Sequence, residues 1–79
     1  MTYHPHLTGE VIRLQRKKRG MSQEVLSGLA GIARSHLAMI ENGSKNANVD
    51  TLWRIAAALD MPLSSLILEV ERQTSKQDQ

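Results

Sequence analysis

Basic side chains crowd into one short segment of this 79-residue chain, although its formal net charge is only +2. The segment holds Arg13, Arg16, Lys17, Lys18 and Arg19. Three acidic residues, Glu69, Glu71 and Asp78, lie near the C-terminus. Such asymmetry suggests an anionic partner for one face of the protein. The alternative is a solvated helix end whose cations complement the helix dipole, and charge alone does not separate the two.

Catalytic and metal chemistry find little support in the residues. No cysteine is present, which removes disulfides, thiol chemistry and cysteine-ligated zinc. His4 and His6 flank Pro5 without a third ligand, so we expect no metal site there. We find no paired carboxylates with a plausible cleft, no spaced Ser/His/Asp set and no phosphate-cradling glycine motif. We therefore expect neither an enzyme nor a cofactor or small-molecule ligand.

A second group of polar residues stands within Met21 to Gly43, which reads as two short helices joined by a turn. Ser22 supplies a hydroxyl N-cap for the first helix, and Gly31 closes it. Between them, apolar residues recur at helical spacing: Leu26, Leu29 and Ala30. The glycine-marked turn predicts that the second helix follows at once.

The second helix is expected from about Arg34 to Asn42, with Leu37 and Ile40 on one apolar face. Its other faces leave residues free to meet a partner: Arg34, Ser35, Ala38 and Met39. Two helices joined by a turn of three or four residues that contains glycine form a helix-turn-helix, whose second helix enters the DNA major groove. The sequence thus indicates DNA as the anionic partner.

Further helices must hold this stretch in place. The first is expected to run from Thr8, as its N-cap, to Gly20. Another follows the N-cap Asn48 to about Leu59 and presents an unambiguous apolar face: Leu52, Ile55, Ala56 and Leu59. Trp53 lies next to this face and is expected to pack at the edge of the core.

The last helix begins near Pro62 and carries its own apolar stripe: Leu63, Leu66, Ile67 and Val70. Aromatic residues make up only 3% of the chain, so the core must be aliphatic. These patterns predict an all-α, compact five-helix bundle, with a flexible arm over residues 1–7, a DNA-binding domain over 8–72 and a disordered polar tail over 73–79. With no signal peptide or membrane-spanning run, we expect a soluble, cytoplasmic protein.

The ordered set of short motifs resembles the Cro/repressor-type (XRE-like, lambda-repressor-like) helix-turn-helix regulators over about Gly9 to Leu68. The matching words are Gly9, IR at Ile12, GMSQ from Gly20, AGI from Ala30, IENG from Ile40 and TLWRIAAAL from Thr51. The stand-alone form is similar to the controller proteins of restriction-modification systems and to small Cro-like phage regulators. The resemblance implies a transcriptional regulator, which could act as a repressor or as an activator.

The resemblance also implies roles for individual residues. Arg34 and Ser35, with Ala38 and Met39 one turn further on, would read base edges, and the Arg34 guanidinium suits guanine. The implied phosphate contacts are Gln23, His36, Asn42, Lys45 and Asn46. His36 is equally explained as a solvent-facing or packing residue. Arg16 and Glu41 match a family pair that joins the first helix to the end of the recognition helix, so both are assigned to structure.

Some positions depart from the family pattern. Gln15 replaces a residue usually buried, Val25 replaces the glutamate that would complete a capping box with Ser22, and Gly28 and Ala33 weaken the two helices of the motif. These departures bear on stability more than on function.

One short recognition helix reads only a few base pairs, so we expect a homodimer on a pseudo-palindromic operator. Its predicted interface is the stripe of the last helix: Leu63, Leu66, Ile67 and Val70. Covering the chain's own core explains the same stripe equally well. The chain ends soon afterwards, and we expect no effector-binding domain. The alternative is an antitoxin-type interaction module in which DNA binding is secondary; such a module would usually carry a toxin-binding extension.

Overall fold

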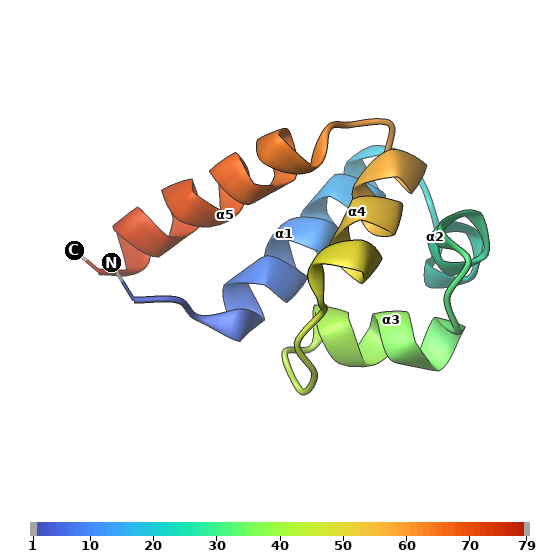
Figure 1. The fold of residues 1–79 in the computed structure, drawn as a ribbon, viewed down its shortest axis with the longest axis horizontal. Coiled ribbons are helices and arrows are strands. Elements are labelled where there is room, and N and C mark those ends of the chain that lie inside the picture. The colour runs from blue at the N-terminus through green and yellow to red at the C-terminus, as the bar shows by residue number, and fades with distance from the viewer. Residues whose placement is uncertain (1, 79) are drawn as a thin grey trace.

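The protein was analysed as a computed structural model that describes residues 2–78; residue 1 of the predicted arm and residue 79 of the predicted tail lie outside the described residues. The described chain forms α1 (Pro5–Lys18), α2 (Gln23–Ala30), α3 (Arg34–Glu41), α4 (Val49–Ala58) and α5 (Leu63–Gln77) (Figure 1). The predicted all-α five-helix fold is confirmed. α1 lies centrally, with α3 and α5 packed against it and α4 packed against α2 and α5.

α1 begins earlier than the sequence predicted. Its N-cap is His4, and Pro5 occupies the first turn, where a fixed φ and a missing N–H cost nothing. Leu7 is buried, and its contact with the core draws this turn into the domain. Thr8 is also buried, with its hydroxyl 3.0 Å from that of Tyr3, so it is no N-cap. The predicted flexible arm is therefore helical from residue 5 onward.

α5 runs beyond the end that its polar C-terminal composition predicted. It continues to Gln77, through most of the segment expected to be a disordered tail. Thr74 explains the extension, because its side chain is 3% exposed and its hydroxyl donates to the Val70 carbonyl at 2.8 Å. The end of α5 also meets the N-terminal segment, where His4 Nε2 lies 3.3 Å from an Asp78 carboxylate oxygen. The two ends of the described chain are thus neighbours (Figure 1).

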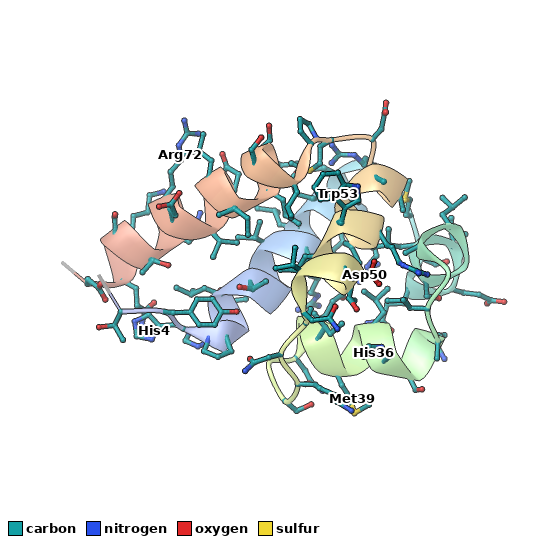
Figure 2. All side chains as sticks on the ribbon, in the orientation of Figure 1. His4, His36, Met39, Asp50, Trp53 and Arg72 are labelled. Carbon is teal, nitrogen blue, oxygen red and sulfur yellow. The ribbon has the colours of Figure 1, made fainter. Side chains whose placement is uncertain are left out.

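The core is aliphatic, as expected, and every helix contributes to it. Its fully enclosed large side chains are Ile12, Leu26, Leu37, Ile40, Ile55, Leu59 and Leu66. Two sequence-based placements are wrong: Leu29 and Trp53 are 63% and 65% exposed. Each lies beside a buried stripe on its helix, and helical spacing alone does not fix where the buried stripe ends. Figure 2 shows Trp53 on α4.

Gly9 lets α1 and α3 cross with their backbones in contact. A Cβ at this position would collide with the carbonyl oxygen of Ile40 and would lie 2.6 Å from that of Glu41. Both carbonyls belong to the last turn of α3, so the close crossing fixes the C-terminal half of that helix against α1.

Within residues 2–78, no single helix is both long and apolar enough to cross a bilayer, and only α4 and α5 counted together, bent by 104°, reach the required length and composition.

Candidate nucleic-acid interface

The turn between α2 and α3 is fixed at both ends by the residues that the sequence singled out. The Ser22 hydroxyl accepts the Val25 N–H at 3.1 Å and so caps α2. Gly31 follows α2 in the left-handed region, with φ of +71°, and the next N–H, from Ile32, bonds back to the Ser27 carbonyl at 3.0 Å. This hydrogen-bonded turn sets the direction in which α3 leaves α2.

α3 separates cleanly into an inner and an outer face. Leu37 and Ile40 are 0% and 2% exposed and pack into the core. The predicted base-reading residues lie away from them: Arg34, Ser35 and Met39 are exposed, and Ala38 is half-buried. The N-cap of α3 is Ala33, which makes no side-chain capping bond. The first turn of the helix thus presents N–H groups without a side-chain cap, next to Arg34 and Ser35.

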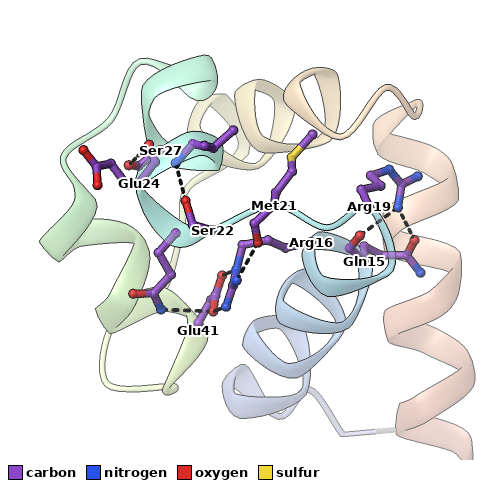
Figure 3. Close-up of polar contacts among 10 residues, drawn as sticks. Gln15, Arg16, Arg19, Met21, Ser22, Glu24, Ser27 and Glu41 are labelled. Atoms are coloured by element: carbon purple, nitrogen blue, oxygen red, sulfur yellow. Dashed lines mark hydrogen bonds and ion pairs between the residues drawn. The ribbon is translucent and has the colours of Figure 1, made fainter.

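The predicted pair of Arg16 and Glu41 is present and buried. Arg16 Nε donates to Glu41 Oε2 at 2.8 Å, and Nη2 donates to Oε1 at 2.9 Å (Figure 3). The remaining guanidinium nitrogen donates to the Met21 carbonyl at 2.9 Å. These hydrogen bonds to Glu41 raise the pKa of Arg16, against the opposing effect of burial. The pair therefore joins α1, the α1–α2 connection and the end of α3.

Gln23 belongs to the same network, which sequence reasoning missed. Its side-chain N–H₂ donates to Glu41 Oε1 at 3.2 Å, and its side chain is half-buried. Glu41 thus orients a residue predicted to contact phosphate. The available signal was the placement of Gln23 at the first turn of α2, directly after the connection to which Arg16 donates.

Only part of the predicted phosphate-contacting set is brought together. Gln23 and Asn42 line one cleft with Ala38, between α1, α2 and α3. Asn42 accepts the Ser44 N–H at 2.9 Å, which orders the turn after α3, and Lys45 is exposed on that turn. Asn46 instead lines an apolar groove beside Tyr3, apart from the cleft. His36, the histidine of the predicted set, lies on α3 (Figure 2) and is half-buried.

The cleft has a volume of about 340 Å³ and is mostly polar. We call it the α1–α3 cleft. It is lined by Arg13, Arg16, Lys17, Gln23, Ala38, Glu41 and Asn42. Two of its cations, Arg13 and Lys17, were not among the predicted phosphate-contacting residues. They had been noted only as part of the basic segment.

The predicted dimer stripe divides between the core and the surface. Leu66 and Val70 are 0% and 4% exposed in the chain's own core, so their assignment to an intermolecular surface is wrong. Leu63 and Ile67 are half-buried and pack over that core. On α4, apolar surface that the sequence assigned elsewhere or not at all is exposed, with Val49 67% and Trp53 65% exposed. Trp53 and Leu63 line one shallow hollow.

The fold and this site define a helix-turn-helix DNA-binding domain. The sequence profile of the helix-turn-helix family matches residues 12–66, which is most of the chain. The chain therefore belongs to the XRE-type helix-turn-helix family and is a DNA-binding transcriptional regulator.

Individual relatives agree with this assignment. The control protein C.MunI of Mycoplasma is 31% identical over 61 residues, which cover 77% of this chain and 82% of that protein. The regulator SlrR of Bacillus subtilis is 36% identical over 61 residues, or 76% of this chain, but the match spans only 40% of SlrR. The restriction-modification controller C.AhdI of Aeromonas hydrophila superposes with a TM-score of 0.74 at 33% identity, over 76% of this chain and 91% of that one.

Proposed function

We propose that this chain is a sequence-specific regulator that binds a pseudo-palindromic DNA operator as a homodimer, with α3 in the major groove. The outer face of α3 is the observation that carries the proposal. It presents Arg34, Ser35, Ala38 and Met39 to solvent while its inner face, the Gly9 crossing and the Arg16–Glu41 pair hold the helix rigidly.

Arg34 is the principal base-reading residue in this proposal. It stands at the first position of α3, is exposed, and within residues 2–78 its guanidinium makes no hydrogen bond or ion pair. A free guanidinium can donate two parallel hydrogen bonds to O6 and N7 of guanine, which discriminates against a wrong base by about 1–3 kcal/mol. Ser35 can serve a base or a phosphate, and Ala38 and Met39 offer apolar contact to a thymine methyl group.

Phosphate contacts would set the register of the domain on the duplex. Gln23 is held by Glu41 at the N-terminus of α2, where the helix dipole favours an anion. Asn42 and Lys45 follow α3 on the exposed turn, in position for the phosphates at the other end of the recognition helix. His36 and Asn46 stay in the proposed set as peripheral contacts.

A homodimer is proposed because one recognition helix reads too few base pairs to select a genomic site. Two-fold symmetry would place half-sites about 34 Å apart, or a small multiple of that distance. The exposed apolar surface of α4 and α5 supports a revised interface of Val49, Trp53, Leu63 and Ile67. An isolated Trp at 65% exposure, close to half-buried aliphatic residues, is typical of an interface anchor.

Selection of bound duplexes from a random pool tests the function and the symmetry together. We expect an enriched sequence with two related, inverted halves. Arg34→Ala should lose the preference at one position of each half-site and about 10-fold or more in affinity, by loss of the bidentate contact. Arg72→Ala, on the exposed side of α5, is the matched control and should bind like the unaltered protein. An unenriched pool would contradict sequence-specific binding, and an Arg34→Ala protein of unchanged preference would contradict the role of Arg34.

A further inference from the structure

The basic segment of α1 contains two cations, Arg13 and Lys17, to which the proposed DNA contacts of α3 assign no role. Arg13 and Lys17 stand one helical turn apart, are exposed, and line the α1–α3 cleft. Within residues 2–78, neither side chain forms an ion pair or a side-chain hydrogen bond. Arg16, between them in sequence, differs because Glu41 neutralises it. Structural pairing therefore accounts for Arg16 but not for its two neighbours.

The other side chains of the α1–α3 cleft come from the elements proposed to face DNA. Ala38 and Asn42 belong to the outer side of α3 and its C-cap, and Gln23 opens α2. The cleft consequently adjoins the base-reading face and is continuous with it through Ala38. Under the proposed function, an anion bound in the cleft would lie beside the duplex that α3 contacts.

The charges of the cleft favour an anion. Since the Arg16 and Glu41 charges cancel, Arg13 and Lys17 provide the uncompensated positive charge, and the N-terminus of α2 adds a partial positive charge. One carboxylate opposes them: Glu10 lies with both cations along a shallow groove on the outer side of α1. It lines that groove and not the cleft itself, so the net charge facing the cleft is positive.

We propose that Arg13 and Lys17 bind backbone phosphates of the DNA strand that flanks the recognition helix, and so extend the phosphate-binding surface from the helix-turn-helix onto α1. The proposal rests on the proposed function. Arg13 supplies a planar fork suited to two phosphate oxygens, and Lys17 supplies a point charge. Gln23 and Asn42 add neutral amide donors to the same cleft. Both cations are positioning residues that carry no sequence information.

The salt dependence of binding separates this role from a structural one. Arg13→Gln and Lys17→Gln should each reduce the slope of log affinity against log salt by about 1 for each bound protomer. The reason is that a protein with one phosphate contact fewer releases fewer counterions from the DNA when it binds. Affinity should fall alike for the selected duplex and for unrelated duplexes, since every sequence has the same phosphates. Arg13→Lys keeps the charge and should restore the slope.

Lys76→Gln is the matched control, because it removes one positive charge near the end of α5, away from the cleft. It should leave the slope unchanged, and circular dichroism should show that all variants stay helical. If Lys76→Gln lowers the slope as much as Arg13→Gln does, net charge alone accounts for the effect and the proposal is overturned.

Two further outcomes distinguish this proposal from the proposed function. Unchanged slopes in both cleft variants, with Arg34→Ala still losing sequence preference, would refute the phosphate role of α1 and leave the function intact. Unchanged behaviour of the Arg34→Ala protein as well would refute the function on which the proposal rests.

Discussion

Replacement of one partner of the Arg16–Glu41 pair is a stringent test of how α3 is held. Glu41→Gln keeps the size of the side chain but removes its charge. The Arg16 side chain, only 9% exposed, would then keep its bond to the Met21 carbonyl and at most one amide acceptor, in place of the two carboxylate oxygens it now contacts. The variant therefore leaves a buried cation without its counter-charge.

The magnitude follows from those contacts. Hydrogen bonds to charged groups contribute about 1.5–3 kcal/mol each, and two are weakened or lost. Removal of one partner of a buried ion pair lowers the free energy of unfolding by about 3–5 kcal/mol. Because the amide oxygen of the new glutamine still accepts one hydrogen bond, we expect Glu41→Gln to lose ~3 kcal/mol. For a domain of this size that loss lowers Tm by on the order of 15 °C, at about 4–8 °C per kcal/mol.

Urea unfolding followed by circular dichroism measures the change in the free energy of unfolding. The double variant Arg16→Met, Glu41→Leu removes both charges and should recover most of the loss, because apolar replacements of a buried pair are close to neutral. Because the pKa of Arg16 is raised, the contribution of its charge to stability is complete below its ordinary pKa and is lost only at still more alkaline pH. Titration of Arg16 should therefore not change the stability loss of Glu41→Gln near neutral pH. A loss below about 1 kcal/mol in Glu41→Gln would show that the pair behaves like an exposed one and would refute the reasoning.

Three other predictions, the first of them a contrasting pair of glycine replacements, concern separate parts of the fold. Gly28→Ala should stabilise the protein by up to about 1 kcal/mol, since a Cβ there meets nothing within 4 Å, whereas Gly9→Ala should destabilise it by about 1–3 kcal/mol or more through its collision with α3; urea midpoints measure both. Trp53→Ala should change stability by less than about 1 kcal/mol yet weaken dimerisation about 30-fold, in line with a hot-spot loss of about 2 kcal/mol, as measured by sedimentation. The Asp78 pKa should lie below its ordinary value of 3.8, mainly because the Thr2 N–H donates to its carboxylate and secondly because of His4; the N-terminal tie is then complete above that value and is lost as the pH falls further, which a chemical-shift titration follows.

Each of these predictions has an outcome that contradicts it. A destabilised Gly28→Ala would mean that the outer side of α2 is more crowded than the structure shows. A Trp53→Ala protein that dimerises normally would move the interface away from α4. An Asp78 titration at its ordinary pKa would show that the ends of the chain are not joined in solution.

Much of the local structure follows from the sequence because its causes are local. Ser22 and Asn48 cap their helices as predicted, and Gly31 adopts the left-handed conformation that closes α2. Each of these depends on residue type and on the next few residues only. The same holds for the apolar face of α4, whose four predicted members are all buried.

The remaining differences arise from tertiary contacts, which periodicity does not encode. The stripe of α5 was correctly read as apolar, but only the fold shows that Leu66 and Val70 face the chain's own core. Trp53 was predicted to pack at the edge of the core because it lies next to an apolar helix face, whereas the fold leaves it exposed. At the candidate site, the hydrogen bond from Gln23 to Glu41 joins residues far apart in sequence. The family resemblance predicted the pair of Arg16 and Glu41 but not the contact of Gln23 with it.

The division of α3 into two faces has a consequence for how such a regulator changes its target. Everything that anchors the helix lies on its inner side: Leu37, Ile40, Glu41 and the backbone that crosses Gly9. The side chains of Arg34, Ser35 and Met39 are exposed and lie outside that anchoring, while Ala38 is half-buried beside it. In the proposed function, exchange of the exposed side chains Arg34, Ser35 and Met39 would change the operator preference and leave the inner contacts of α3 unaltered. The outer side chains of α3 can in this sense vary independently of the inner contacts that hold the helix.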